Sequence, residues 1–242
     1  RVDDQLVGRS GRPGDPGESR FFVSQEDDII RLFGDEKPRP LSPAVARRAQ
    51  LRAEDADFSQ RKGALEADCI LQDHRYNFLK DRNRLLETDD PAGLLREMIA
   101  NTVRLLREEY PDPANRYADF RIAFHRVFGS EAMPEAADTP DEAAYAAGAE
   151  KVLAAKEEAA PGVFDELARA VMLQCADEAW SMFLEEFENL KTGYHLMSVG
   201  KSSPRQVLIE YSFPILRWTN GYVLKEGLRR VFQCRLERKK EE

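Results

Sequence analysis

The chain has 242 residues, of which 42% are hydrophobic and 33% are charged. No apolar run approaches the roughly 18 residues that span a bilayer, so we predict no transmembrane helix, and the polar start predicts no secretory leader. The net charge of −8 disfavours non-specific binding to nucleic acid, which needs an excess of Lys and Arg. Because the first residue is not Met, we expect a piece cut from a longer protein.

The three cysteines, Cys69, Cys175 and Cys234, are far apart and form no CxxC pair. An odd, scattered set argues against a disulfide framework and against a cysteine zinc site. The pattern therefore predicts a reducing, cytoplasmic location and no bound metal.

The first 34 residues have a mixed pattern that predicts a small α/β remnant. A Gly-rich turn region leads into RFFVS (residues 20–24), which is typical of a short strand. The following EDDIIRLFG predicts a short helix that ends at Gly34.

A linker with three prolines follows, and Ser42-Pro43 is a strong helix start. From Ala44 to about Leu86 we expect one helix of roughly 60 Å, at 1.5 Å per residue. Its large apolar residues recur every seven positions, with Gln72 as the one miss. This narrow stripe predicts a strut that contacts several neighbours, and a coiled coil is the alternative. The stripe consists of Leu51, Phe58, Leu65, Leu79 and Leu86.

The middle of the chain predicts shorter helices that begin at the pairs Asp90-Pro91, Asp112-Pro113 and Thr139-Pro140. In the third, Glu142 lies three residues after Thr139 and would complete a capping box. The last section predicts two long amphipathic helices, the first running to Gly193, joined by a short polar loop into an antiparallel hairpin. The second helix starts at Ser203-Pro204 and contains Pro214, which should kink it.

The opening segment also carries a chemical pattern, QLVGRSGR. Glycines let the backbone approach a ligand closely, and Arg9 and Arg12, on a turn entering a helix, could clamp a polyphosphate through bidentate contacts. Such a pair can stabilise charge on a transferring γ-phosphoryl group, as an arginine finger does. A Gly/Arg-rich surface loop that binds nothing is the alternative. The nucleotide-binding residues of the pattern would be Gln5, Gly8 and Gly11, and the catalytic ones Arg9 and Arg12.

QLVGRSGR resembles the Q-x-x-G-R-x-G-R motif of superfamily 2 helicase-like ATPases. The extension GDPGESRFFVSQEDDIIRLFG is similar to the end of the second nucleotide-binding domain of SecA, the bacterial preprotein-translocating ATPase family. Residues 49–86 resemble the long scaffold helix of SecA, and residues 180–213 resemble its two-helix finger. The finger resemblance rests on Trp180, Leu190, Gly193, His195-Leu196, Pro204, Gln206, Ser212 and Phe213.

The resemblance implies a mainly α fold with a RecA-like remnant at its start. Its expected parts are the motor-domain tail (1–34), the linker and scaffold helix (35–89), a wing-like domain (90–160), and the finger with the scaffold end (161–242). It also implies ATP and Mg²⁺ in the intact protein, and the SecYEG channel, unfolded preprotein and the missing N-terminal motor domains as partners. Nucleic acid is not among them, while an anionic membrane surface and a homodimer stay open. The expected location is the inner face of the bacterial plasma membrane.

The hairpin loop would contact the polypeptide through His195, Met197 and Val199. Val199 occupies a tip position where the family often has Tyr, and Met197 replaces a neighbouring Arg, which suggests a divergent or accessory homologue. The chain contains no GxxxxGK[ST] motif, so we expect no ATPase activity from it alone. The alternatives are a superfamily 2 helicase fragment that acts on nucleic acid and a non-enzymatic helical interaction module.

Overall fold

The computed structural model describes residues 2–11, 14–35, 40–111, 115, 117–134, 141–197 and 203–234, with only the backbone for 194–197. The chain forms two compact units, residues 1–65 and 66–242, and the boundary falls within one helix. The helices, with one short 3₁₀ helix, are α1 (Val2–Val7), α2 (Asp28–Phe33), α3 (Pro43–Glu87), α4 (Pro91–Glu109), α5 (Ala118–Phe128), η1 (Ser130–Ala132), α6 (Glu142–Ala159), α7 (Val163–Met197) and α8 (Pro204–Gln233).

The described residues contain no strand, which confirms a mainly α fold but not the expected α/β remnant. Residues 20–24, predicted as a strand, are irregular and exposed. A strand is stable only when its N–H and C=O groups pair with a neighbouring strand, and the described part of the chain offers none. None of the described helices is long and apolar enough to cross a membrane.

The first unit is held together by polar contacts from α3 to the segment before it. Arg52 donates to the backbone oxygens of Phe33 (3.1 Å) and Gly34 (2.8 Å), at the end of α2. Arg48 and Arg52 both pair with Asp35, at 2.9 and 3.1 Å. Asp35, which the sequence placed in a linker, is therefore a structural anchor.

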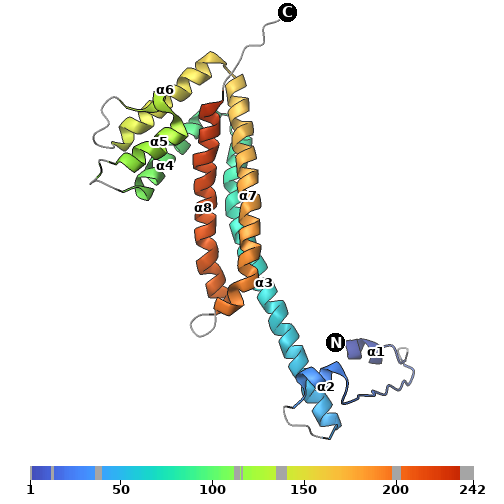
Figure 1. Ribbon diagram of the computed structural model, residues 1–242. Coiled ribbons are helices and arrows are strands. Elements are labelled where there is room, and N and C mark those ends of the chain that lie inside the picture. Colours follow the sequence, from blue (N-terminus) through green and yellow to red (C-terminus); the bar gives the residue numbers. More distant parts are fainter. Residues whose placement is uncertain are drawn as a thin grey trace, which may run out of the picture. The chain divides into compact units, whose positions relative to one another are not determined.

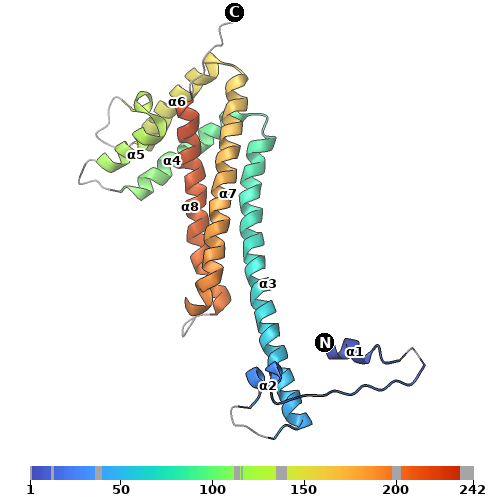
Figure 2. The same ribbon diagram turned by 45° about the vertical axis from the view of Figure 1, so that its right-hand side comes forward.

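In the second unit, α7 and α8 run side by side and antiparallel in both views, with the second-unit part of α3 along α7 (Figures 1 and 2). Phe78 of α3 stacks on Trp180 of α7, with ring centroids 4.9 Å apart. The stack continues along α7 through Phe183 and Phe187. The predicted hairpin is thus confirmed, and aromatic packing attaches α3 to it.

The helices α4, α5 and α6 form a lobe beside the end where α7 begins and α8 ends (Figure 1). Its core contains an aromatic face of α5, with Phe120 and Phe124 fully buried and in edge contact with Tyr145 of α6. The same core includes Phe164 of α7 and Leu228 of α8. One apolar core therefore joins the lobe to the base of the hairpin.

Most predicted helix starts and ends are confirmed. The side chains of Ser42, Asp90 and Ser203 accept hydrogen bonds from backbone N–H groups three residues on, and α2 ends at Gly34. The cap of α6 is Asp141, whose side chain accepts from the N–H of Ala143 at 3.0 Å. Thr139-Pro140 and Asp112-Pro113, the other two predicted starts, lie outside the described residues, and α5 begins only at Ala118.

Two predictions about the long helices are wrong. The helix expected to end at Gly193 continues to Met197, because a single glycine costs only about 1 kcal/mol within a long helix. The seven-residue stripe on α3 is not the packed face: Leu51, Phe58, Leu65 and Leu86 are exposed. In the second unit the buried face consists of Ala67, Ile70, His74, Phe78 and Leu85. It follows the spacing of three and four residues that helix packing requires, and it includes a small and a polar residue that a search for large apolar side chains misses.

Candidate functional site

The segment that carries the motif arginines starts with a helix and ends in a turn. The backbone N–H groups of Gly8, Arg9 and Ser10 donate to carbonyls of α1, at 2.9 to 3.1 Å, and close its last turn. The Ser10 hydroxyl also donates to the carbonyl of Val7 at 2.7 Å. Arg9 therefore follows a helix, and the expectation of a turn entering a helix is wrong for it, because the next helix begins only at Asp28.

Glycines let this segment fold back on itself. A Cβ at Gly11 would lie 3.0 Å from the carbonyl oxygen of Asp15, and a Cβ at Gly17 would lie 2.7 Å from the carbonyl carbon of Ser10. Gly14 has a φ of +95°, which favours glycine. The glycines thus allow backbone to approach backbone, which makes a compact loop beside Arg9.

Arg9 and Gln5 are exposed, and their side chains have no partner among the described residues. A guanidinium left free on a compact loop can still receive a phosphate group. Arg12 and Val199 lie outside the described residues, as do the side chains of His195 and Met197, whose backbones form the last turn of α7. Gln5, Gly8, Arg9 and Gly11 thus lie in α1 and the turn that follows it, and both the nucleotide contacts and the finger contacts stay predictions.

Residues outside the predicted site connect α3 to the hairpin. Arg82 of α3 forms a bidentate ion pair with Asp177 of α7, at 2.7 and 3.0 Å. This hydrogen bonding lowers the pKa of the Asp177 carboxyl. Arg169 of α7 donates to the carbonyls of Leu86 (3.3 Å) and Thr88 (2.6 Å), at the end of α3. These long-range pairs have no local pattern that could have revealed them.

A second polar cluster fastens α7 to α8. Arg229 and Arg230 both pair with Glu226, and hydrogen bonds from Arg229 and then Arg230 hold the pKa of that carboxyl at about 2. Arg230 also pairs with Glu178 of α7 at 2.8 Å. Beside them, burial raises the pKa of the Cys175 thiol to about 11, so this cysteine is not a nucleophile near neutral pH.

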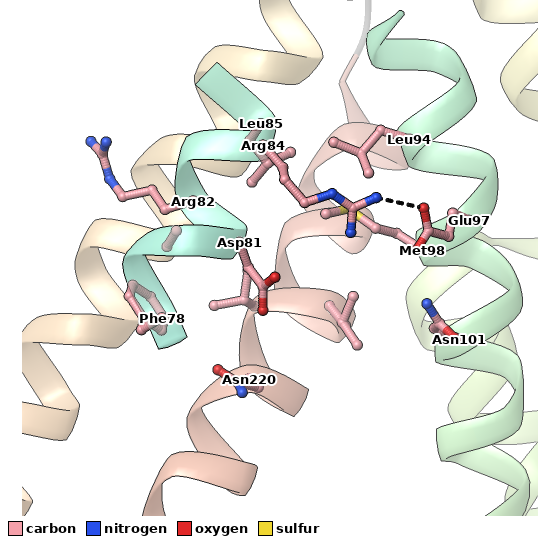
Figure 3. A pocket seen from close by; sticks show the side chains of 13 residues that line it. Phe78, Asp81, Arg82, Arg84, Leu85, Leu94, Glu97, Met98, Asn101 and Asn220 are labelled. Atoms are coloured by element: carbon pink, nitrogen blue, oxygen red, sulfur yellow. Dashed lines mark hydrogen bonds and ion pairs between the residues drawn. The ribbon is translucent and has the colours of Figure 1, made fainter. Parts of the chain in front are cut away.

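A cavity of about 190 Å³ lies where α3, α4, α7 and α8 meet (Figure 3). Its apolar lining includes Phe78, Leu85, Leu94 and Met98. At its rim Arg84 pairs with Glu97 at 2.9 Å, both half-exposed, while the Arg82 guanidinium is held by α7. Because both arginines are used to tie helices together, this cavity is typical of a joint between scaffold and lobe rather than of a reaction centre.

Comparison with family models assigns this chain to a class of proteins. A model described as the SecA wing and scaffold domain matches residues 40–219, and one described as the SecA P-loop domain matches residues 1–44. The long helix, the hairpin and the helical lobe are thus those of a wing and scaffold domain. The chain belongs to the SecA family. This finding supports the SecA resemblance over a nucleic-acid helicase fragment.

Curated relatives agree. The chain is 28% identical to the protein translocase subunit SecA of Anaplasma marginale, over 98% of the chain and 31% of that relative. It is 31% identical to that of Carboxydothermus hydrogenoformans, over 92% of the chain and 28% of the relative. It is 27% identical to that of Pelobacter propionicus, over 100% of the chain and 30% of the relative. The chain therefore spans less than a third of the length of these relatives.

Proposed function

We propose that the chain is the C-terminal part of a SecA-like motor that couples ATP hydrolysis to preprotein translocation through the SecY channel. Residues 1–34 would be the tail of the second motor domain, 35–89 the linker and scaffold helix, 90–160 the wing, and 161–242 the finger with the scaffold end. The family match over residues 1–44 and 40–219 carries this proposal. The whole protein would work at the inner face of the plasma membrane.

The first unit has the surface of an incomplete domain. Among its described residues, the buried apolar side chains are Val45 and Ala49. Large apolar side chains are exposed instead, such as Phe22 at 90% and Leu32 at 67%. Exposed apolar surface of this kind indicates a contact with another domain. The rest of the motor, which relatives of three times this length contain, is the partner we propose.

Arg9 and Arg12 would act as arginine fingers on ATP held by the rest of the motor. Bound ATP with Mg²⁺ supplies the phosphoryl group whose transfer releases the free energy for transport. The fit is supported by Arg9, whose guanidinium is exposed and has no partner among the described residues. The guanidinium would donate to phosphate oxygens and stabilise negative charge there, while Gly8 and Gly11 leave room for close approach.

The second unit would transmit the motion of the motor to the finger. The Arg82–Asp177 pair, the Arg169 contacts and the Phe78–Trp180 stack connect α3 firmly to α7. A displacement of α3 would therefore move the hairpin as a whole. The loop near Val199, with His195 and Met197, would then press on the unfolded preprotein at the channel.

The test is charge removal in the full-length protein that carries this chain. We expect Arg9→Ala to lower ATP turnover roughly 10³-fold, the smallest effect of a lost arginine finger, with ATP binding retained. Arg20→Ala is the matched control, because Arg20 is also exposed in the same segment and, within the described part of the chain, pairs with the exposed Glu18. Unchanged ATPase and transport in Arg9→Ala would favour a non-enzymatic interaction module. ATP turnover by the 242-residue chain alone would contradict the proposal that the rest of the motor holds the ATP.

A further inference from the structure

Four polar or charged side chains are buried among the described residues: His74, Thr102, Ser212 and Thr219. The two threonines donate to carbonyls of their own helices, four residues back. His74 and Ser212 instead pair with each other, between α3 and α8, across 138 residues of sequence. Within the described chain, this pair is therefore the buried polar contact that joins two helices through side chains.

The pair has a defined hydrogen-bond direction. The Ser212 hydroxyl donates to the carbonyl of Ile209 at 3.2 Å, so its single proton is used. With the Ser212 proton assigned to Ile209, the 2.9 Å contact is a bond that the His74 Nε2–H donates to the Ser212 oxygen.

His74 links α3 to both helices of the hairpin. It projects from α3, donates to Ser212 of α8, and meets Phe183 and Phe187 of α7 edge-on, with centroids 5.6 and 6.4 Å apart. In such apolar surroundings a buried imidazole stabilises the fold no more than an apolar ring would, unless its hydrogen bond is made. The satisfied bond therefore selects an arrangement of the helices rather than adding bulk stability.

Only one register satisfies the pair. One helical turn along α8, the residues on the same face are Leu208 and Leu216, both buried and unable to accept a hydrogen bond. One turn along α3, the residues are Ile70 and Phe78, which are also buried and apolar. A slip of about 5.4 Å, one turn, would leave the imidazole N–H unpaired in an apolar setting.

We propose that His74 and Ser212 are positioning residues that set the register of the α7–α8 hairpin along α3. The role rests on the proposed function, because it matters for transport only if the hairpin acts on the polypeptide. The hydrogen bond is made in one register and lost in the neighbouring ones, so motion of α3 is passed to α8 without slippage.

The experiment measures register and transport separately, in the full-length protein. Spin labels at exposed positions 77 of α3 and 210 of α8, with Cys69 and Cys234 changed to Ser, report the distance between the helices. We expect a single narrow distance in the unaltered pair and in His74→Gln, whose amide can also donate to Ser212. In His74→Leu and Ser212→Ala the distance should broaden or shift by up to about 5 Å.

Transport gives the second readout. Polypeptide moved per ATP hydrolysed should fall several-fold in His74→Leu and Ser212→Ala and recover in His74→Gln. Thr219→Val is the matched control, because it removes a buried hydroxyl of α8 that, among the described residues, bonds to a carbonyl of its own helix.

An unchanged distance in both His74→Leu and Ser212→Ala would overturn the inference, as would a Gln variant that behaves like Leu. If His74→Leu fails to fold, Ser212→Ala carries the test. The distance could shift as expected while no protein transports polypeptide, including the one in which His74 and Ser212 are unchanged. That result would reject the proposed function and retain the register assignment.

Discussion

Two glycines within helices should respond in opposite directions to the same substitution. Gly148 lies in α6 and Gly193 in α7. A Cβ built at Gly148 would overlap the carbonyl oxygen of Ala132 and lie 3.2 Å from its carbonyl carbon. A Cβ built at Gly193 would meet nothing within 4 Å. The pair therefore separates intrinsic helix propensity from tertiary packing.

The magnitudes follow from these surroundings. Replacing glycine by alanine inside a helix stabilises it by about 1 kcal/mol, mainly by restricting the unfolded chain. Gly193→Ala should gain about 0.5–1 kcal/mol. At Gly148 the obstacle is backbone of η1, which no rotamer change can move, and overpacking costs about 1–3 kcal/mol. Because the cost is expected at the upper end of that range, Gly148→Ala should lose about 1–2 kcal/mol.

Urea unfolding followed by far-ultraviolet circular dichroism measures both effects. We expect the transition midpoint to rise for Gly193→Ala and to fall for Gly148→Ala, with the slope unchanged. A midpoint that rises in both variants would show that η1 does not lie against α6 as described. A midpoint that falls in both would show that α7 does not continue as a regular helix through Gly193.

Two further predictions concern the scaffold. Arg169→Met should lower the free energy of unfolding by about 2 kcal/mol, because it removes charged hydrogen bonds to the end of α3. Arg84→Met is the control, and loss of its half-exposed ion pair should cost less than about 1 kcal/mol. Equal losses in the two variants would contradict the role of Arg169 at the end of α3. Burial lowers the pKa of His74, against an opposing effect of Asp73, so the neutral form is favoured when folded. The contribution of neutral His74 to the free energy of unfolding should be fully present above the ordinary histidine pKa of about 6.5 and be lost as the pH falls below it. If the melting temperature falls as steeply with pH in His74→Gln, protonation of His74 is not the cause.

Local sequence signals determined much of this fold. The caps at Ser42, Asp90 and Ser203, and the Gly34 stop, are encoded within a few residues, because a capping side chain bonds to backbone three positions away. The hairpin was predictable because apolar residues at helical spacing identify a buried face within one segment. The motif at Gln5–Arg12 was visible for the same reason, since its chemistry depends on residue types at short, fixed spacing.

Tertiary structure alone decided which face of α3 is buried and what holds it. In the second unit, regular spacing indicated Leu86, which is exposed, whereas the packed face includes Ala67 and His74. A helix face is buried only where another helix lies against it, and the residue spacing within α3 does not show where α7 and α8 lie. The Arg82–Asp177 and His74–Ser212 pairs join residues 95 and 138 positions apart for the same reason. Sequence therefore specified the helices and the motif, whereas the packing of distant segments determined how the helices are joined.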